Sequence, residues 1–294
     1  MTVIIQHLID AASLGGIYAM AALGIGLIFG IMGLINFAHG DFIMVGAYGI
    51  LLMSGNPMLI VAVTAVIVVV LLALSSDRLV FRQLRGADGP TLLIASFGLS
   101  YLLQNTILMI FGGRPKAADF GRSLVETVTI GSVRISKLDI FTIVTTALLL
   151  TGLTLFLRKT RLGIEMRAAA SDFHMAQLLG IRANRVVATA FGLSGVLAAA
   201  VSLLMVAQTG AVSPHMGLIL VLFAFVATIM GGMGSLPGAA LGGFIVGFAS
   251  VGLQIFLPPH LRPFRDGFLF AFVVVMFTLF PGGLISGKRM GERV

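Results

Sequence analysis

Charge is scarce in this chain of 294 residues, because charged residues make up only 10% of it. A soluble domain carries about 25% charged residues. Cysteine and tryptophan are absent, and the lack of cysteine excludes disulfides, thiolate catalysis and thiolate metal sites. Apolar residues make up 58% of the sequence, and the mean hydropathy is +1.09. The composition therefore indicates an integral membrane protein.

Motifs for enzyme chemistry are also missing. The sequence has no HExxH metal helix, no GxSxG nucleophile turn and no close carboxylate pair within a hydrophobic stretch. It lacks the G-x-x-x-x-G-K-[ST] phosphate loop, so the chain cannot hydrolyse ATP by that route. We therefore expect no enzyme activity and no cofactor bound by this chain. If the chain pumps a solute, the energy comes from a partner.

Two further classes are disfavoured by where the charges lie. The net charge of +8 could suggest nucleic acid, but the Lys and Arg residues lie between hydrophobic segments, so we expect no nucleic-acid partner. Asp10, Asp41 and Asp139 lie near segment ends rather than in segment interiors. Proton- or sodium-driven transport is therefore disfavoured, because ion relays normally require ionisable groups within the membrane.

The hydrophobic pattern predicts nine helical stretches, since a bilayer core of about 30 Å requires roughly 20 apolar residues per helix. The second stretch is much shorter than that, so we expect it to be tilted, broken or re-entrant. The fold class is an all-α, polytopic transmembrane helix bundle of eight or nine spans, in one domain over 1–294. No signal peptide is expected, because the first residues lack a basic region. The predicted stretches are 8–35, 41–53, 58–74, 91–111, 138–157, 186–206, 217–233, 237–257 and 267–285.

The positive residues set the expected orientation, because cytoplasmic loops carry an excess of Lys and Arg. Most of them follow the third, fifth and last stretches, which predicts an outer N-terminus and an inner C-terminus. The loop at about 158–185 is then cytoplasmic, and the long loop at about 112–137, with five positive residues, is periplasmic. Arg262 and Arg265 would also face outward. The residues expected inside are Arg78, Arg82, Arg85, Arg158, Lys159, Arg161, Arg167, Arg182, Arg185, Lys288, Arg289 and Arg293.

A short segment rich in polar residues, INFAHGD at 35–41, separates the first two stretches. Asn36 and His39 could hydrogen-bond a tight break in the chain, and Asp41 could cap the next helix. The alternative is that Asn36, His39 and Asp41 line or gate a translocation path.

Glycine is concentrated in MGGMGSLPGAALGGFIVG at 230–247. Gly238 and Gly242 form one small-xxx-small stripe, and Ala239, Gly243 and Gly247 form a second, which pack either within one bundle or against a partner subunit. Gly231, Gly232, Gly234 and Pro237 interrupt the segment. The exposed backbone of such an interruption can face a polar substrate, so these three glycines are candidates for the translocation path or its gate.

The loop after the fifth stretch contains GIEMRAAASDFHMAQLLGI, at 163–181, which favours a helix ending at Gly180. On a helical wheel, Ile164, Ala168, Met175 and Leu179 share one face. Met166, Phe173 and Gly180 share roughly the opposite face, with Glu165 and Asp172 on one edge and Arg167 and His174 on the other. A helix that is apolar on two faces requires contacts on both sides, such as the bundle and a soluble partner. The alternative is a helix that lies on the bilayer surface.

Four stretches resemble the permease subunits of branched-chain amino acid ABC importers, and the resemblance runs nearly end to end. They are GGIYAMAALGIGLIFGIMGLINFAHGDF at 15–42, MVGAY at 44–48, RLGIEMRAAASDFHMAQLLGI at 161–181 and AFVATIMGGMGSLPGAALGG at 224–243. Two positions depart from the family's pattern, because Phe223 and Phe280 stand where basic residues are frequent. Relatives of this type also move urea, short amides and small organic acids, so these departures leave the solute open.

The resemblance implies a permease in a bacterial inner membrane, with several partners. These are a second, similar or identical permease, two cytoplasmic ATP-binding subunits that hold ATP and Mg, a periplasmic solute-binding protein and membrane lipid. The stretch 165–180 would be the cytoplasmic coupling helix that docks into an ATP-binding subunit. The residues expected to carry this coupling are Glu165, Arg167, Ala168, Ala169, Asp172 and Gly180.

Two rival functions remain open at this point. A passive channel for a small neutral solute such as urea explains the uncharged stretches, but it does not explain the two-faced cytoplasmic helix. A secondary transporter that binds sodium through backbone carbonyl groups alone is the second rival.

Overall fold

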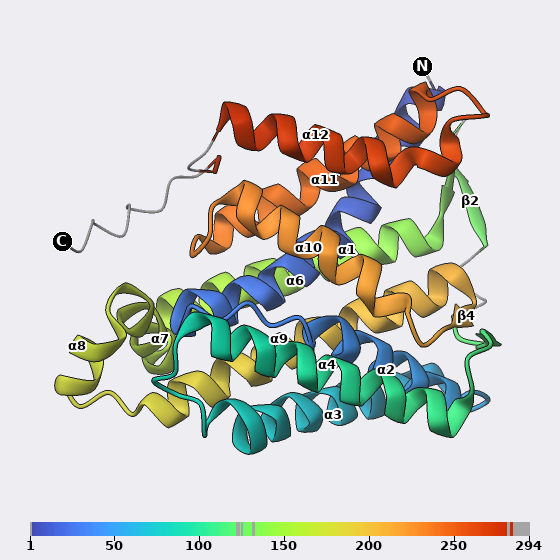
Figure 1. The fold of residues 1–294 in the computed structure, drawn as a ribbon. Helices are drawn as coiled ribbons and strands as arrows, with labels where there is room; N and C mark the ends of the chain where they lie inside the picture. Colours follow the sequence, from blue (N-terminus) through green and yellow to red (C-terminus); the bar gives the residue numbers. More distant parts are fainter. Residues whose placement is uncertain (1, 122–123, 125, 131–132, 281–282, 285–294) are drawn as a thin grey trace.

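The structure is a computed structural model that describes residues 2–121, 124, 126–130, 133–280 and 283–284. Over these residues the fold is an all-α bundle, with four short strands at one end (Figure 1). The long helices are α1 (Thr2–Met32), α3 (Met58–Ser76), α4 (Gly89–Phe111), α6 (Lys137–Lys159), α9 (Ala183–Thr209) and α11 (Leu236–Phe256). The shorter ones are α2 (His39–Leu52), α7 (Arg161–Ser171), α8 (Phe173–Leu178), α10 (Met216–Gly231) and α12 (Arg265–Leu279), with a π-helix η1 (Asp77–Phe81) and a 3-10 helix η2 (Arg262–Phe264).

Helix α1 is the central element of the bundle and packs against α11, α9, α10 and α6. Its contact with α11 is closest, because a Cβ at Gly243 would overlap the backbone of Ala19 and one at Gly247 would overlap Gly15. The other stripe of α11, Gly238 and Gly242, lies against α10 in the same way. Both stripes are therefore used for packing within one chain, since small residues let helix backbones approach closely.

Six helices in the described part of the chain are long and apolar enough to cross a membrane. They are Ile4–Met32, Met58–Phe81, Gly89–Phe111, Lys137–Lys159, Ala183–Thr209 and Leu236–Phe256. Helices α2 and α10 are apolar but shorter, and α12 has 15 residues. All nine predicted stretches are helical over most of their length, yet only six of them meet the length of an independent span.

Several predicted stretches extend beyond the C-terminal end of the helix in the structure. Helix α1 ends at Met32 rather than at 35, because Gly33 adopts a φ of 65° that stops the helix. Helix α10 ends at Gly231 rather than at 233, where Gly232 has a φ of 110°. Helix α12 ends at Leu279 rather than at 285.

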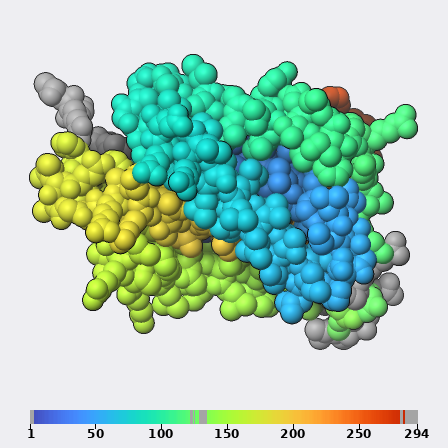
Figure 2. Space-filling view, turned by 90° about the horizontal axis from the view of Figure 1, so that it is seen from below, coloured from blue at the N-terminus to red at the C-terminus, as the bar shows by residue number. Residues whose placement is uncertain are grey.

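The two ends of the bundle differ in structure. At one end, α7 and α8 project beyond the other helices (Figure 1), and Figure 2 shows the yellow residues around the start of α9 at the same end. At the other end, β1 (Lys116–Ala117) pairs with β4 (Ala211–Val212), and β2 (Thr127–Ile130) pairs with β3 (Val133–Ser136), both antiparallel. Among the positive residues used for orientation, Arg122, Lys288, Arg289 and Arg293 lie outside the described residues.

Candidate functional sites

The break between α1 and α2 is held by contacts on both sides. Within the break, the backbone N–H of Ala38 donates to Asn36 Oδ1 at 3.2 Å. Ser96 of α4 donates its hydroxyl to the carbonyl oxygen of Ile35 at 3.2 Å. Phe37 stacks on Phe97 of α4, with ring centroids 4.3 Å apart, and also contacts Phe225 of α10. The role expected of Asn36, a hydrogen bond that stabilises a tight break, therefore agrees with this geometry.

His39 connects the start of α2 to another helix rather than to the break itself. Its Nδ1 lies 3.0 Å from the hydroxyl oxygen of Ser194 in α9, and both side chains are buried. The imidazole also lies against Gly24 of α1, where a Cβ would overlap the ring. Ser194 is about three turns inside α9, and Gly24 is about two turns from the end of α1. Helix α2 therefore begins in the interior of the bundle rather than at its end.

The expectation that Asp41 caps α2 was wrong. The helix begins at His39, and its N-cap residue, Ala38, makes no side-chain cap hydrogen bond. Asp41 lies within the first turn, where its N–H donates to the carbonyl oxygen of Ala38 at 3.0 Å. Its carboxyl group is buried and faces Ser100 and Gln104 of α4. A cap must precede the helix. Because α2 starts two residues before Asp41, this side chain lies within the helix and contacts α4 instead.

Buried polar atoms are concentrated around α2. Within the described residues, Asn36 Nδ2, His39 Nε2, Asp41 Oδ2 and Tyr48 Oη have no hydrogen-bond partner and are closed to solvent. Asn36, His39 and Asp41 therefore lie together at the start of α2 and are all buried; we call them the α2 group. Their role in a translocation path or gate stays a prediction.

The start of α10 meets the start of α2. Gly217 and Gly40 are in backbone contact, so that a Cβ at either position would overlap the carbonyl group of the other. Two short helices thus begin side by side inside the bundle and run toward opposite ends. This arrangement of broken helices is tolerated in membrane proteins where protein surrounds the irregular backbone.

The other predicted gating glycines lie elsewhere, in the turn between α10 and α11. Gly232 and Gly234 have φ values of 110° and 87°, and Gly231 packs against the backbone of Gly238. The N–H of Leu284 donates to the carbonyl oxygen of Met230 at 2.9 Å, and Ser235 caps α11 by accepting from the N–H of Gly238 at 3.2 Å. The turn is at the α7 end of the bundle, because Gly234 and Arg167 line the same small pocket. It is therefore separate from the α2 group.

The predicted helix at 163–181 is two helices rather than one. Asp172 has an extended backbone, with φ −154° and ψ 105°, and its Oδ1 accepts from the N–H of Met175 at 2.9 Å as the N-cap of α8. Thr160 caps α7 in the same way, accepting from the N–H of Gly163 at 3.0 Å. Gly180, with φ 87°, ends α8 as expected. The break arises because an aspartate that bonds the backbone three residues later favours a helix start over a helix interior.

The two-sided character of this segment persists despite the break. Gly163, Met166, Ala169 and Ala176 are buried against the bundle. Four of the segment's large apolar side chains are more than half exposed. They are Ile164 (52%), Met175 (55%), Leu178 (70%) and Leu179 (81%). Of the remaining predicted coupling residues, Arg167 and Ala168 are exposed, while Glu165 and Asp172 are half-buried.

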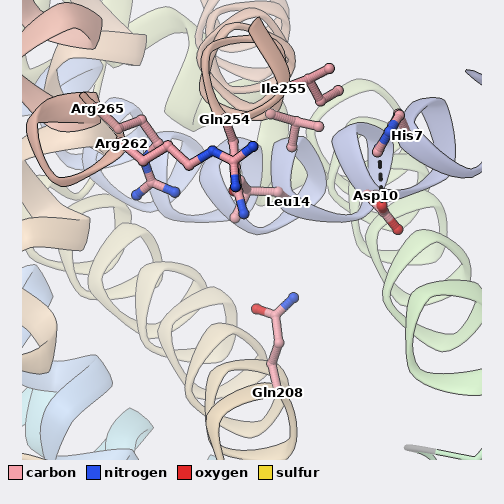
Figure 3. A pocket seen from close by; sticks show the side chains of 9 residues that line it. His7, Asp10, Leu14, Gln208, Gln254, Ile255, Arg262 and Arg265 are labelled. Atoms are coloured by element: carbon pink, nitrogen blue, oxygen red, sulfur yellow. Dashed lines mark ion pairs between the residues drawn. The ribbon is translucent and has the colours of Figure 1, made fainter. Parts of the chain in front are cut away.

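A polar cleft at the opposite end was not anticipated. It has a volume of about 600 Å³ and is lined by His7, Asp10, Leu14, Gln208, Val251, Gln254, Ile255, Arg262 and Arg265. Figure 3 shows the two arginines on one side of it and the His7 and Asp10 pair on the other, with Gln208 reaching in from α9. The sequence held a partial signal, because these polar residues fall at the ends of hydrophobic stretches. The described residues include no group of three or more His, Asp and Glu side chains that could hold a metal ion.

These features define a class, namely an all-α, multi-pass membrane protein with a broken helix in its interior and a helical loop projecting from one end. A sequence profile described as branched-chain amino acid transport system, permease component, matches residues 7–279. The chain is 33% identical over 305 residues to the high-affinity branched-chain amino acid transport system permease protein BraD of Pseudomonas aeruginosa, with 99% of this chain and 98% of the relative covered. It is 32% identical to the corresponding protein LivH of Escherichia coli strain K12, with 99% and 97% covered. The chain belongs to this family of branched-chain amino acid transport permeases.

A solved structure supports the fold. PsaBC from Streptococcus pneumoniae in complex with Fab superimposes with a TM-score of 0.50 and 14% sequence identity, over 92% of this chain and 91% of that one. The arrangement of helices is therefore similar, and at this identity the likeness concerns the fold alone.

Proposed function

We propose that the chain is the membrane permease of a bacterial ABC importer that moves branched-chain amino acids, or a related small polar organic solute, across the inner membrane. Similarity to permeases of this kind over almost the whole chain is the observation that carries the proposal. The chain acts as one domain over 1–294 and crosses the membrane eight or nine times. Helices α2 and α10 are each too short to cross it alone and contribute to these crossings together with neighbouring segments.

Its partners are a second permease of similar or identical kind, two cytoplasmic ATP-binding subunits that hold ATP and Mg, and a periplasmic solute-binding protein. The chain itself binds no cofactor. The end that carries α7 and α8 faces the cytoplasm, in line with the excess of positive residues in the loops there.

The α7–α8 segment is the site that couples the permease to an ATP-binding subunit. Its buried side, with Met166 and Ala169, fixes it to the bundle, and its exposed apolar side offers Met175, Leu178 and Leu179 to a partner. Burying a leucine side chain contributes about 1.5–3 kcal/mol, so two or three such contacts stabilise a docked subunit. Ala168 is on the exposed side and Ala169 on the buried side, so only a change at Ala168 tests docking without disturbing the bundle.

Movement of this segment by the ATP-binding subunits would shift the bundle between inward-facing and outward-facing states. Binding of ATP can only drive this change if the subunits contact the two states differently. The α2 group, with Asn36, His39 and Asp41, is the interior part that the two states would repack, and the glycine turn at 231–234 beside Arg167 connects that movement to α11.

The test is reconstitution of the assembled importer with Leu178→Ser and Leu179→Ser in the permease. We expect ATP-dependent leucine uptake to fall by about tenfold or more, because the apolar contact with the ATP-binding subunit is lost. Leu52→Ser is the matched control, since Leu52 is 65% exposed at the other end of the molecule. Unchanged uptake by the double variant would contradict the coupling role, and solute flux that continues without ATP would favour a passive channel.

A further inference from the structure

We propose that the polar cleft at the end opposite α7 and α8 is an outer binding site for a small aliphatic zwitterion of the α-amino acid class. The inference rests on the proposed import function, because it assigns the site at which the permease receives the solute from its binding protein. Three kinds of lining group, on different elements, carry it.

The first group is cationic. Arg265 is already paired, since its Nη2 lies 2.9 Å from Asp266 Oδ1. Arg262 donates Nε–H to the carbonyl oxygen of Leu257 at 3.4 Å, and no ion pair joins its guanidinium to a carboxylate among the described residues. Its terminal N–H groups therefore remain available. A guanidinium binds a carboxylate with two parallel hydrogen bonds, so Arg262 suits the carboxylate end of an amino acid.

The second group is anionic and lies across the cleft. Asp10 Oδ2 is 3.8 Å from His7 Nδ1 one turn earlier in α1. An ammonium group placed beside Asp10 is attracted to its carboxylate, because opposite charges at short range attract. The amide oxygens of Gln208 and Gln254 offer it further acceptors.

The third group is apolar. Leu14, Val251 and Ile255 line the same cleft as the charged groups, and they suit an aliphatic side chain. The volume of about 600 Å³ falls within the roughly 300–1,000 Å³ typical of small-molecule sites. A simple ion would gain nothing from the apolar wall, and a neutral solute would gain little from charges of both signs. An aliphatic zwitterion uses all three groups.

The experiment compares Arg262→Gln and Asp10→Asn in the complete importer, reconstituted in liposomes with ATP and leucine-loaded binding protein. Uptake of leucine and stimulation of the ATPase are both measured. We expect each variant to lower uptake by about tenfold, the effect of losing one charge-assisted hydrogen bond, while ATPase stimulation stays within about twofold of the wild-type value. Arg262→Lys, which keeps the charge, should retain more uptake than Arg262→Gln. The control is Arg114→Gln, an exposed positive residue at the same end that does not line the cleft.

Two results would overturn the inference. One is wild-type uptake by both variants, and the other is a parallel fall of uptake and ATPase stimulation, which would make the cleft a docking surface for the binding protein. A failure of the proposed function itself would look different, because the wild-type importer would then show no ATP-dependent uptake of leucine.

Discussion

The Nδ1 atom of His39 lies 3.0 Å from the hydroxyl oxygen of Ser194, which joins the first residue of α2 to the middle of α9. The ring is held there from the other side by α1, where Gly24 leaves room for it. Helices α1 and α2 and the distant helix α9 therefore meet at one imidazole.

This packing makes Gly24 sensitive to a single methyl group. In Gly24→Ala the new Cβ overlaps the imidazole ring, and we expect the free energy of unfolding to fall by about 1–3 kcal/mol, as for other overpacked sites. Thermal denaturation of the purified permease in detergent measures the change. Gly49→Ala is the control, because within the described structure no atom lies within 4 Å of a Cβ at Gly49. Equal melting temperatures for the two variants would show that the ring moves aside freely.

The close contact between α1 and α11 predicts that an added methyl group at Gly243 lowers the free energy of unfolding more than one at Gly24. A methyl group there meets the backbone of Ala19, which cannot rotate away as a side chain can, so we expect Gly243→Ala to cost about 3 kcal/mol. The yield of monodisperse protein on size exclusion and its melting temperature should both fall. Gly252→Ala on the same helix serves for comparison, since its Cβ would have open space in the described structure. Equal yields and melting temperatures for Gly243→Ala and Gly252→Ala would contradict the close approach of α1 and α11.

Arg85, which follows η1, forms an ion pair with Asp77 of η1 and a hydrogen bond to the start of α9. Arg85 Nη2 lies 2.5 Å from Asp77 Oδ1, and Arg85 Nη1 also donates to Asn184 Oδ1. Both charged side chains are largely buried, so Arg85→Ala leaves a carboxylate without its partner and should destabilise the fold by about 3 kcal/mol. In the Arg85→Ala background, Asp77→Asn should restore part of the lost melting temperature. If Arg85→Ala and Asp77→Asn lower the melting temperature additively, the two side chains do not form a stabilising ion pair.

The cap of α8 predicts a local effect. Asp172→Ala removes the acceptor for the N–H of Met175 and should cost about 1 kcal/mol. Amide hydrogen exchange should become faster in Phe173–Leu178 and stay unchanged in α9. Asp172→Ser, which keeps a capping oxygen, should exchange nearly as slowly as the wild type. Exchange in Asp172→Ala at the wild-type rate would mean that the packing of Ala176 alone holds α8.

The helices were predictable because their signal is continuous along the chain. Runs of apolar residues marked nine stretches that are largely helical in the described structure, six of them long enough to cross a membrane. Gly180, which has a positive φ, marked the end of α8. The wheel also placed Ile164, Met175 and Leu179 on one face, and all three are exposed. The break at Asp172 was missed because the alanines before it favour a helix, although an aspartate is itself a common N-cap residue that precedes a helix.

Contacts between distant segments were not predictable in the same way. Asn36, His39 and Asp41 were identified as a group, but their partners are on α4 and α9, so Asp41 was misassigned as a cap. The cleft combines residues from α1, α9, α11 and the η2–α12 region. No periodic pattern connects those positions, and only the packing of the bundle brings them together.

The interior start of α2 also constrains how the protein is assembled. Its 14 residues form a helix about 21 Å long, less than the roughly 30 Å of a hydrocarbon core. The buried polar atoms of Asn36, His39 and Asp41 would meet lipid if this segment entered the membrane alone. Since His39 packs on α1 and bonds to α9, α2 reaches its place only after a helix more than 140 residues later in the sequence has been made. The N-terminal segments are thus synthesised before they can complete their folding, and α2 reaches its final position only when α9 is present.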